Sequence, residues 1–349
     1  MNMTADIRQP DRAKYDEAKE RWDSIAKPLG SFGKLEDIVC RIAAIQGTTD
    51  VDISSRAVVV MCGDHGVVAE GVTQCGSEVT AECAKDIALG RASVNAVAET
   101  VGARVVTVDV GIASDVECEG LINKKVAYGT GDMVHGPAMS SALTKKALAV
   151  GIDIAGRLAA EGVKIIVAGE MGIGNTTAAS AVSSVLLGLP PEQVTGRGAG
   201  LSDKGLRRKA AVIRQAIEIN RPDPNDAFSV LQKLGGLEIA AMAGLFIGGA
   251  LFRMPVIVDG IISAAAAAAA VKYTPDCAAF ILASHRSGEP AADALLSLTG
   301  AEPVIDAGLR LGEGTGGLLL LPLIDAALGI YRNARRFEDT NIERYVELS

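Results

Sequence analysis

Aromatic residues are scarce in this chain of 349 residues, which contains one Trp, five Tyr and six Phe. Hydrophobic residues nevertheless make up 49% of the sequence, so Ala, Val, Ile and Leu must supply most of the core. The 39 glycines and the many alanines predict helices packed tightly on a sheet, with small side chains at the contacts. The length allows one large domain and a smaller one.

Positive charge is also in short supply. The formal net charge is −8, and the sequence contains no run of Lys or Arg residues. A nucleic-acid backbone or an anionic membrane surface attracts proteins through clustered positive charge. The charge balance therefore argues against nucleic acid or a membrane as the main partner.

Uninterrupted apolar stretches of about 20 residues, which a membrane-spanning helix needs, are missing. Two apolar segments come nearest, but Arg253 and Asp259 interrupt 239–271, and Asp325 falls within 318–328. We expect both segments to be buried core. Because the N-terminus has no apolar signal core, we expect the protein to work in the cytoplasm.

Metal-binding and disulfide patterns are absent as well. None of the six cysteines forms a Cys-x-x-Cys pair, and the three histidines lack metal-ligand spacing. The sequence therefore predicts reduced thiols, no disulfide framework and no zinc site. The cysteines are Cys40, Cys62, Cys75, Cys83, Cys118 and Cys277, and the histidines are His65, His135 and His285.

What the chain does contain is a regular alternation of strand and helix patterns. This alternation predicts an α/β fold, a doubly wound and mainly parallel sheet with helices on both faces. We expect a large domain over 24–277 and a small helical domain built from 1–23 plus 278–349. The expected strands are 57–62, 104–110, 163–168, 255–258 and 279–283. The expected helices include 11–26, a second one ending near 46, 78–101 with a break near Gly90, 139–161 and one ending at Leu187.

Polar loops follow the predicted strands, and open α/β sheets bind their ligands at the carboxyl ends of the strands. We therefore expect these loops to lie at one end of the sheet. In the first loop, 63–67, His65 is either an acid–base group or a loop histidine with a local hydrogen bond. We favour the second interpretation, because no partner is visible in the sequence.

A glycine-rich loop at 169–177 leads directly into a helix, an arrangement that predicts an anion site. The hydroxyls of Thr176 and Thr177 add donors. A second glycine loop at 195–200 precedes four basic residues, one of which is expected to close over a phosphate. The spacing matches neither a dinucleotide-binding fingerprint nor a Walker loop, which argues against an oxidoreductase or an NTPase. The basic residues are Lys204, Arg207, Arg208 and Lys209.

The segment 309–317 places a single carboxylate, Glu313, between Gly312 and Gly314, just before an apolar run. Glycine on both sides allows a ligand or another backbone to come close. Desolvation there raises a carboxyl pKa toward the range of a general base. The alternative is a turn whose carboxylate points into water, and the spacing alone leaves both interpretations open.

Eight ordered motifs together resemble the nicotinate-nucleotide:dimethylbenzimidazole phosphoribosyltransferase family over nearly the whole chain. The resemblance implies a single-step transfer of ribose 5-phosphate from nicotinate mononucleotide to the lower-ligand base of cobamides. The base attacks C1 of the ribose with inversion, and nicotinate leaves, so that no metal or other cofactor is needed. The motifs are 27–36, 63–67, 108–112, 136–140, 169–177, 259–260, 284–285 and 310–314.

The resemblance also implies roles for individual residues, with Glu313 as the general base. Three groups of binding residues are then expected, for the nucleotide, its phosphate and the acceptor base. They are Gly172, Gly174, Asn175 and Thr176 for the nucleotide, Gly198, Lys209 and Ser287 for the phosphate, and Glu170, Met171, Leu311, Cys75 and Cys83 for the base.

The chain departs from the family pattern in the base pocket. Cys75 and Cys83 stand where the family usually has Ser and Gln, and an alanine tract lies near residues 263–270, from Ala264 to Ala270. Thiols are weaker hydrogen-bonding groups than those they replace. A phenolic or purine acceptor is therefore an alternative to a benzimidazole, and a heterodimer with a paralogue is an alternative to a homodimer. A non-catalytic supporting subunit is the third alternative, which the intact Glu313 argues against.

Overall fold

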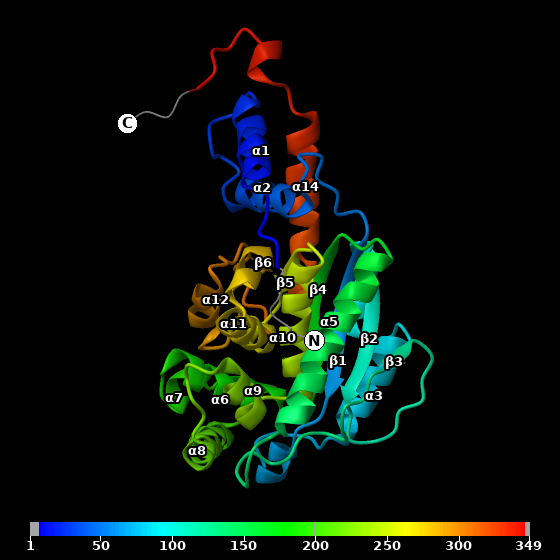
Figure 1. Ribbon diagram of the computed structural model, residues 1–349, viewed down its shortest axis with the longest axis vertical. Helices are drawn as coiled ribbons and strands as arrows, with labels where there is room; N and C mark the ends of the chain where they lie inside the picture. Colours follow the sequence, from blue (N-terminus) through cyan, green and yellow to red (C-terminus); the bar gives the residue numbers. More distant parts are fainter. Residues whose placement is uncertain (1–6, 199, 346–349) are drawn as a thin grey trace.

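The structure, a computed structural model, describes residues 7–198 and 200–345. Its centre is a six-stranded, all-parallel sheet in the order β3-β2-β1-β4-β5-β6, which confirms the predicted doubly wound fold (Figure 1). The order reverses between β1 and β4, and loops at such a switch point commonly bind ligands. The strands are β1 (Arg56–Gly63), β2 (Arg104–Gly111), β3 (Leu121–Asn123), β4 (Ile165–Met171), β5 (Val256–Val258) and β6 (Ile281–Ala283).

Five of these strands lie where the sequence predicts them, and β3 was not predicted. β3 has only three residues and lies at the edge of the sheet beside β2. The central strands are continuous apolar runs because both faces of the sheet are covered. In β1, Val59 and Met61 face one hydrophobic core, whereas Val58 and Val60 face the other.

Helices cover both faces of the sheet (Figure 1). The first core lies beneath α5 (Ser141–Ala160), α6 (Asn175–Leu187), α9 (Ala227–Leu234), α10 (Leu237–Leu251) and α11 (Ile261–Tyr273). The second core lies beneath α2 (Lys34–Gln46), α3 (Glu78–Ala88), α4 (Ser93–Thr100), α13 (Thr315–Leu318) and α14 (Leu320–Asn333). Other helical segments are α7 (Pro191–Val194), α8 (Asp203–Asn220), α12 (Ala292–Thr299), η1 (Gly66–Glu70), η2 (Pro275–Phe280) and η3 (Phe337–Asp339).

Small residues let α5 and α10 pack backbone against backbone, as the composition predicts. A Cβ atom on Gly151 would lie 1.9 Å from the carbonyl oxygen of Ala241. A Cβ atom on Gly244 would lie 2.0 Å from the carbonyl oxygen of Leu148. Only glycine permits this approach, which brings α10 down onto the sheet. The alanine tract of α11 is buried on all sides, and segment 239–271 is core apart from the exposed Phe252 in the connection between α10 and β5.

One stretch, Thr315–Asn333, is long and apolar enough to cross a membrane by length and composition, but 56% of its apolar window is buried inside the protein. Leu320, Leu321 and Ile324 on α14 belong to the second core and are fully buried. Helix α14 also packs against α2. It is therefore a core helix of this fold.

Helices α1 (Arg12–Ser24), α2 and α14 form a lobe at one end of the molecule (Figure 1). The ring of Trp22 lies 5.2 Å from that of Tyr331 and 6.4 Å from that of Phe32, measured between centroids. These contacts join the two chain ends. The division into 24–277 and 1–23 plus 278–349 stays a prediction, and two elements lie across it: α2 packs against α1, and β6 extends the sheet.

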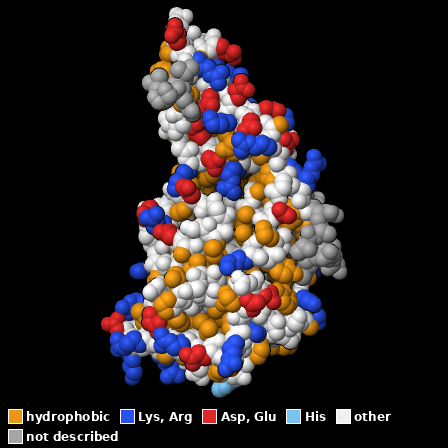
Figure 2. All heavy atoms as spheres, turned by 60° about the vertical axis from the view of Figure 1, so that its left-hand side comes forward, with side chains coloured by type: hydrophobic (Ala, Val, Ile, Leu, Met, Phe, Trp, Pro, Cys, Tyr) orange, Lys and Arg blue, Asp and Glu red, His pale blue; other side chains and the backbone are white. Residues whose placement is uncertain are grey.

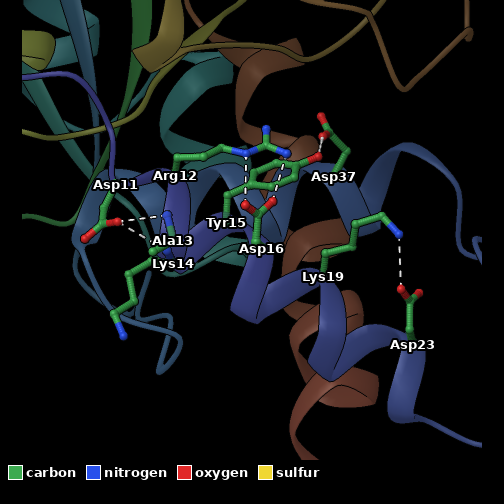
Figure 3. Close-up of polar contacts among 9 residues, drawn as sticks. All are labelled: Asp11, Arg12, Ala13, Lys14, Tyr15, Asp16, Lys19, Asp23 and Asp37. Carbon is green, nitrogen blue, oxygen red and sulfur yellow. Dashed lines mark hydrogen bonds and ion pairs between the residues drawn. The ribbon is translucent and has the colours of Figure 1, made fainter.

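Polar contacts on the outer face of α1 fix the start of this helix and attach it to α2 (Figure 3). The carboxylate of Asp11 accepts hydrogen bonds from the first backbone N–H groups of the helix, those of Ala13 and Lys14. The hydroxyl of Tyr15 donates a 2.6 Å hydrogen bond to Asp37 of α2. The other ion pairs on this face, Arg12–Asp16 and Lys19–Asp23, are exposed, so they contribute little to the stability of the fold.

Candidate active site

The loops after β4, β5 and β6 meet the segment 308–314 around a cavity of about 210 Å³. All of these loops lie at the carboxyl end of the sheet, as the sequence predicts. The polar side chains of the lining include four carboxylates, one imidazole and the guanidinium of Arg310. The lining contains Glu170, Met171, Gly172, Asn175, Thr176, Gly198, Asp259, Ser263, His285, Ser287, Glu289, Leu311, Gly312 and Glu313.

The Gly-Glu-Gly turn has left-handed backbone at three consecutive residues. The φ angles are 89° at Gly312, 61° at Glu313 and 88° at Gly314. Glycine suits this region, whereas a residue with a side chain is strained there. Space is equally tight, because a Cβ atom on Gly314 would lie 2.5 Å from the Val58 side chain. Strain of this kind gathers at functional sites, which marks Glu313 as a candidate.

Two buried carboxylates hold this turn in place. Glu170, near the end of β4, accepts a hydrogen bond from the Glu313 backbone N–H at 3.3 Å. Asp259, after β5, accepts from the N–H groups of Gly314 at 3.2 Å and Gly317 at 2.9 Å. Glu313 is therefore anchored by strands β4 and β5, far from it in the sequence.

The Glu313 side chain points its Oε2 atom at the first turn of α4. This oxygen accepts a hydrogen bond from the Val94 backbone N–H at 3.1 Å. No described residue lies within hydrogen-bond distance of the other oxygen, Oε1. Burial raises the pKa of the Glu313 carboxyl, and the bond from Val94 opposes this shift. The structure thus leaves one carboxylate oxygen available to a ligand in the cavity.

Glu170 lies beside Glu313 but has both oxygens occupied. Its Oε1 accepts from the Glu313 N–H, and its Oε2 accepts from the side-chain amide of Asn175. Burial, reinforced by the nearby charge of Asp259, raises the pKa of Glu170 to about 7. Because both oxygens bind donors of the protein, Glu170 supports the turn and the start of α6.

His285 and its neighbours complete this end of the cavity. The Ser284 hydroxyl donates to the carbonyl oxygen of Val258 at 2.7 Å and lies 2.9 Å from Nδ1 of His285. Burial lowers the pKa of His285, and the charge of Asp259 opposes this shift. The sequence motifs included Asp259 and His285 without a role for either. The sequence could have indicated both as site residues, because each lies in the polar segment directly after a predicted strand.

The opposite end of the cavity, where it adjoins a smaller cavity that Lys209 lines, is suited to a phosphate. Lys209 of α8 is 1% exposed, and its Nζ donates to Thr176 Oγ1 at 2.8 Å. Burial lowers the pKa of Lys209 to about 8, and the charge of Glu289 opposes this shift. A Cβ atom on Gly198 would lie 3.5 Å from Lys209 Nζ, so this glycine borders the ammonium group. Helix α6 begins here, with no side chain capping its N-terminus.

The other three basic residues of α8 lie elsewhere. Lys204, Arg207 and Arg208 are exposed. Arg208 pairs with Glu70 at 3.7 Å and donates to its backbone carbonyl. Thr177, expected to donate at the anion site, is fully buried and does not line the cavity. Lys209 is thus the cation that the structure brings to the glycine loops.

The two candidate cysteines are placed differently from each other. Cys75 lines a smaller cavity of about 90 Å³, which also contains Gly174 and Lys209 and shares Asn175 and Thr176 with the main one. Cys83 of α3 lines neither cavity, but burial and then the Glu313 carboxylate raise the pKa of its thiol. Both stay candidates for the base pocket, with Cys83 on the side of Glu313.

The first loop, after β1, is not part of the cavity. His65 is buried, and its Nε2 lies 2.6 Å from Oε1 of Glu238 at the start of α10. The expectation of a local hydrogen bond was wrong, because the partner lies 173 residues away in the sequence. Among the described residues, one surface group, Glu70, Asp132 and His135, brings possible metal ligands within 4.8 Å of one another. It lies outside the cavity lining, and Arg208 already pairs with Glu70.

Comparisons with known proteins agree with this geometry. A family model described as phosphoribosyltransferase matches residues 7–342. The chain is 44% identical over 330 residues to the nicotinate-nucleotide–dimethylbenzimidazole phosphoribosyltransferase of Acetivibrio thermocellus, covering 95% of this chain and 94% of the relative. It is 39% identical to the enzyme of that name from Clostridium acetobutylicum, covering 99% of each. The crystal structure of CobT from Thermus thermophilus superposes with a TM-score of 0.90 at 38% identity, covering 95% of this chain and 100% of that one.

Proposed function

The chain belongs to the nicotinate-nucleotide–dimethylbenzimidazole phosphoribosyltransferase family, and from this premise we propose how its cavity performs the transfer. The enzyme is a pentosyltransferase that moves ribose 5-phosphate from nicotinate mononucleotide to a lower-ligand base, releasing nicotinate and forming α-ribazole phosphate. We place the acceptor base at the Glu313 end of the cavity and the phosphate at the Lys209 end. This assignment follows the charges of the two ends.

The chemistry is a displacement at C1 of the ribose. A ring nitrogen of the base forms the new C–N bond, and the electron pair of the old C–N bond returns to the pyridinium nitrogen, so that neutral pyridine nitrogen leaves with nicotinate. The other ring nitrogen of the base then carries a proton that must be removed. The enzyme's task is to align the two rings and to accept this proton.

Glu313 is the proton acceptor in this proposal. The single observation that carries the choice is the unpartnered Oε1 of Glu313, in a half-buried carboxylate that lines the cavity. Glu170 is less suited, because both of its oxygens already accept protein hydrogen bonds. A carboxylate with a raised pKa is a better match for a weakly acidic nucleophile than one in water.

The phosphate is held by charge and by backbone N–H groups. Lys209, Thr176, Gly198 and Ser287 lie around the start of α6, whose uncapped N-terminus favours an anion. A buried ammonium group forms a strong hydrogen bond with a dianion. The transfer itself needs no added Lewis acid, because the positive charge of the pyridinium already activates the leaving group.

The relatives' name favours a benzimidazole over a phenol or a purine as the acceptor, and an active enzyme over a supporting subunit. The thiols of Cys75 and Cys83 keep the exact base open to experiment. The test is an acceptor panel with nicotinate mononucleotide, in which products are identified by mass. We expect dimethylbenzimidazole to have the highest kcat/KM. A faster phenol or purine would reassign the acceptor, and no product with any acceptor would reject the proposal.

We also propose a homodimer that works in the cytoplasm. All six cysteines are free thiols, as is usual in a reducing compartment. Figure 2 shows charges of both signs interspersed over the lobe, whereas hydrophobic side chains are more frequent on the larger body below it. Sedimentation at micromolar concentration, alone and with a paralogue, tests the assembly. A monomer in both experiments would contradict it.

A further inference from the structure

His285 is a buried side chain of the cavity that the transfer mechanism above does not use. It is 3% exposed, lines the main cavity and follows strand β6. The backbone of the preceding residue, Ser284, is held on two sides. The Ser284 N–H donates to Val258 at 3.2 Å, and the carbonyl oxygen of Ser284 accepts from Ile305 at 3.0 Å. These backbone hydrogen bonds fix the position of the His285 ring at the end of β6.

Ser284 determines which nitrogen of His285 carries the proton. The single hydroxyl proton of Ser284 is donated to the carbonyl oxygen of Val258 at 2.7 Å. The 2.9 Å contact between Ser284 Oγ and His285 Nδ1 then requires an N–H on Nδ1. A neutral imidazole has one N–H, so Nε2 is left with a lone pair. No described residue lies within hydrogen-bond distance of Nε2, which makes it an acceptor for a ligand.

The position of His285 places this acceptor between the two ends of the cavity. Ser287, two residues later, also lines the cavity and is one of the residues assigned above to the phosphate. On the other side, a Cβ atom on Gly316 would lie 2.3 Å from the His285 ring, and Gly316 follows the Glu313 turn by three residues. Because the ribose joins the phosphate to C1, and C1 must face the acceptor base at the Glu313 end, the ribose lies between the two ends.

The chemistry of the nucleotide identifies the donor. Nicotinate mononucleotide near neutral pH carries a phosphate dianion, a carboxylate and a pyridinium ring without an N–H. Its two ribose hydroxyls are its only hydrogen-bond donors. We propose that Nε2 of His285 accepts a hydrogen bond from a ribose hydroxyl of the bound nucleotide and so selects ribose over deoxyribose. This inference rests on the proposed function of the cavity.

The test compares dissociation constants of nicotinate mononucleotide and its 2′-deoxy and 3′-deoxy analogues, without an acceptor base so that reactivity at C1 plays no part. We expect the wild type to bind one analogue roughly 10- to 100-fold more weakly, as for one buried hydrogen bond left unmade. In His285→Ala this preference should fall to about twofold, because only the ribonucleotide loses affinity. A purely structural role would weaken all three ligands alike.

His135→Ala is the matched control, because His135 is an exposed histidine outside the cavity and should keep the full preference. His285→Gln, which keeps an acceptor near the position of Nε2, should retain part of it. Equal binding of the three nucleotides by the wild type would overturn the inference even if His285→Ala failed to fold. Transfer of ribose phosphate to a base by the same wild-type preparation tests the proposed function separately.

Discussion

The two halves of the sheet carry similar groups at their carboxyl ends, but among the described residues the group of one half lines the main cavity and the group of the other does not. Beyond β4, β5 and β6 lie Glu170, Asp259 and His285, with Glu313 above them. Beyond β1 and β2 lie Asp64, His65 and Asp109, with Lys125 and Glu238 beside them. Both groups are rich in carboxylates and mostly buried, with Glu313 and Lys125 half-buried. They differ in whether their side chains face a cavity: the unpartnered oxygens of Asp64 and Glu238 are enclosed by protein, whereas Glu313 lines the cavity.

In the β1–β2 group the charges pair with one another. His65 lies 2.6 Å from Glu238, and Lys125 lies 3.1 Å from Asp109. The start of α10 covers the strand ends, because a Cβ atom on Gly111 would lie 2.3 Å from the Leu237 side chain. In the β4–β6 group, by contrast, Glu170 and Asp259 bind the turn that holds Glu313, and this turn lines the cavity without filling it. The comparison teaches that an unpartnered atom in a charge cluster makes a site only where that atom faces a cavity.

The largest expected effect is a loss of turnover from a substitution in the β4–β6 group. Glu313→Gln should lower kcat by roughly 10²–10⁴, the usual loss for a general base. The KM for nicotinate mononucleotide should change little, because the substitution removes a proton acceptor and keeps the shape. A phenol acceptor should suffer more than a benzimidazole, since its O–H proton must be removed earlier. Steady-state rates with both acceptors at saturation measure this.

Glu302→Gln is the control for that experiment, because Glu302 is exposed and pairs only with Lys34 at the surface. Its rates should match those of the wild type. If Glu313→Gln keeps nearly full activity with both acceptors, Glu313 is not the base. Glu170, whose raised pKa lies near neutrality, is then the next candidate.

Substitutions in the β1–β2 group should change the stability of the fold rather than the rate of the reaction. Glu238→Ala removes the buried partner of His65 and should lower the free energy of unfolding by about 3 kcal/mol. The kcat per folded molecule should stay within about twofold, because Glu238 does not line the cavity. Urea denaturation and an active-fraction assay separate the two quantities. A large loss of kcat in fully folded protein would show that the β1–β2 group takes part in the reaction.

Lys209→Ala should raise the KM for nicotinate mononucleotide by roughly 10- to 100-fold, with a smaller change in the KM for the base. The reason is the loss of a charge-assisted hydrogen bond to the phosphate. Lys204→Ala is the matched control, because Lys204 lies on the same helix and is exposed. Equal effects of the two substitutions would remove Lys209 from the phosphate site.

The smallest effect concerns pH. The pKa of Lys209 is lowered to about 8, so its ammonium form predominates below pH 8 and is lost above it. We therefore expect kcat/KM for nicotinate mononucleotide to fall by about fivefold between pH 8 and pH 9 in the wild type. In Lys209→Arg this alkaline fall should disappear, because guanidinium stays charged. An identical pH profile in both proteins would assign the fall to another group.

Much of the fold is visible in the sequence because it rests on local patterns. Apolar runs predict β1, β2 and β4, and the glycine near residue 90 separates α3 from α4 as expected. β3 was missed, since three half-buried residues at a sheet edge have no periodicity to detect. Segment 239–271 was expected to be core, and it is, because alanines and glycines there allow backbones to touch.

The sequence by itself determined the order of strands and helices, the polar residues at the strand ends and the glycines that frame Glu313. These depend on neighbouring residues alone. Only the tertiary structure decided which of those polar residues are free. Nε2 of His65 is paired with Glu238, 173 residues away in the sequence. Oε1 of Glu170 accepts a hydrogen bond from the backbone N–H of Glu313, 143 residues away. A hydrogen bond depends on distances of a few ångströms between atoms, and for residues so far apart those distances exist only after the chain has folded.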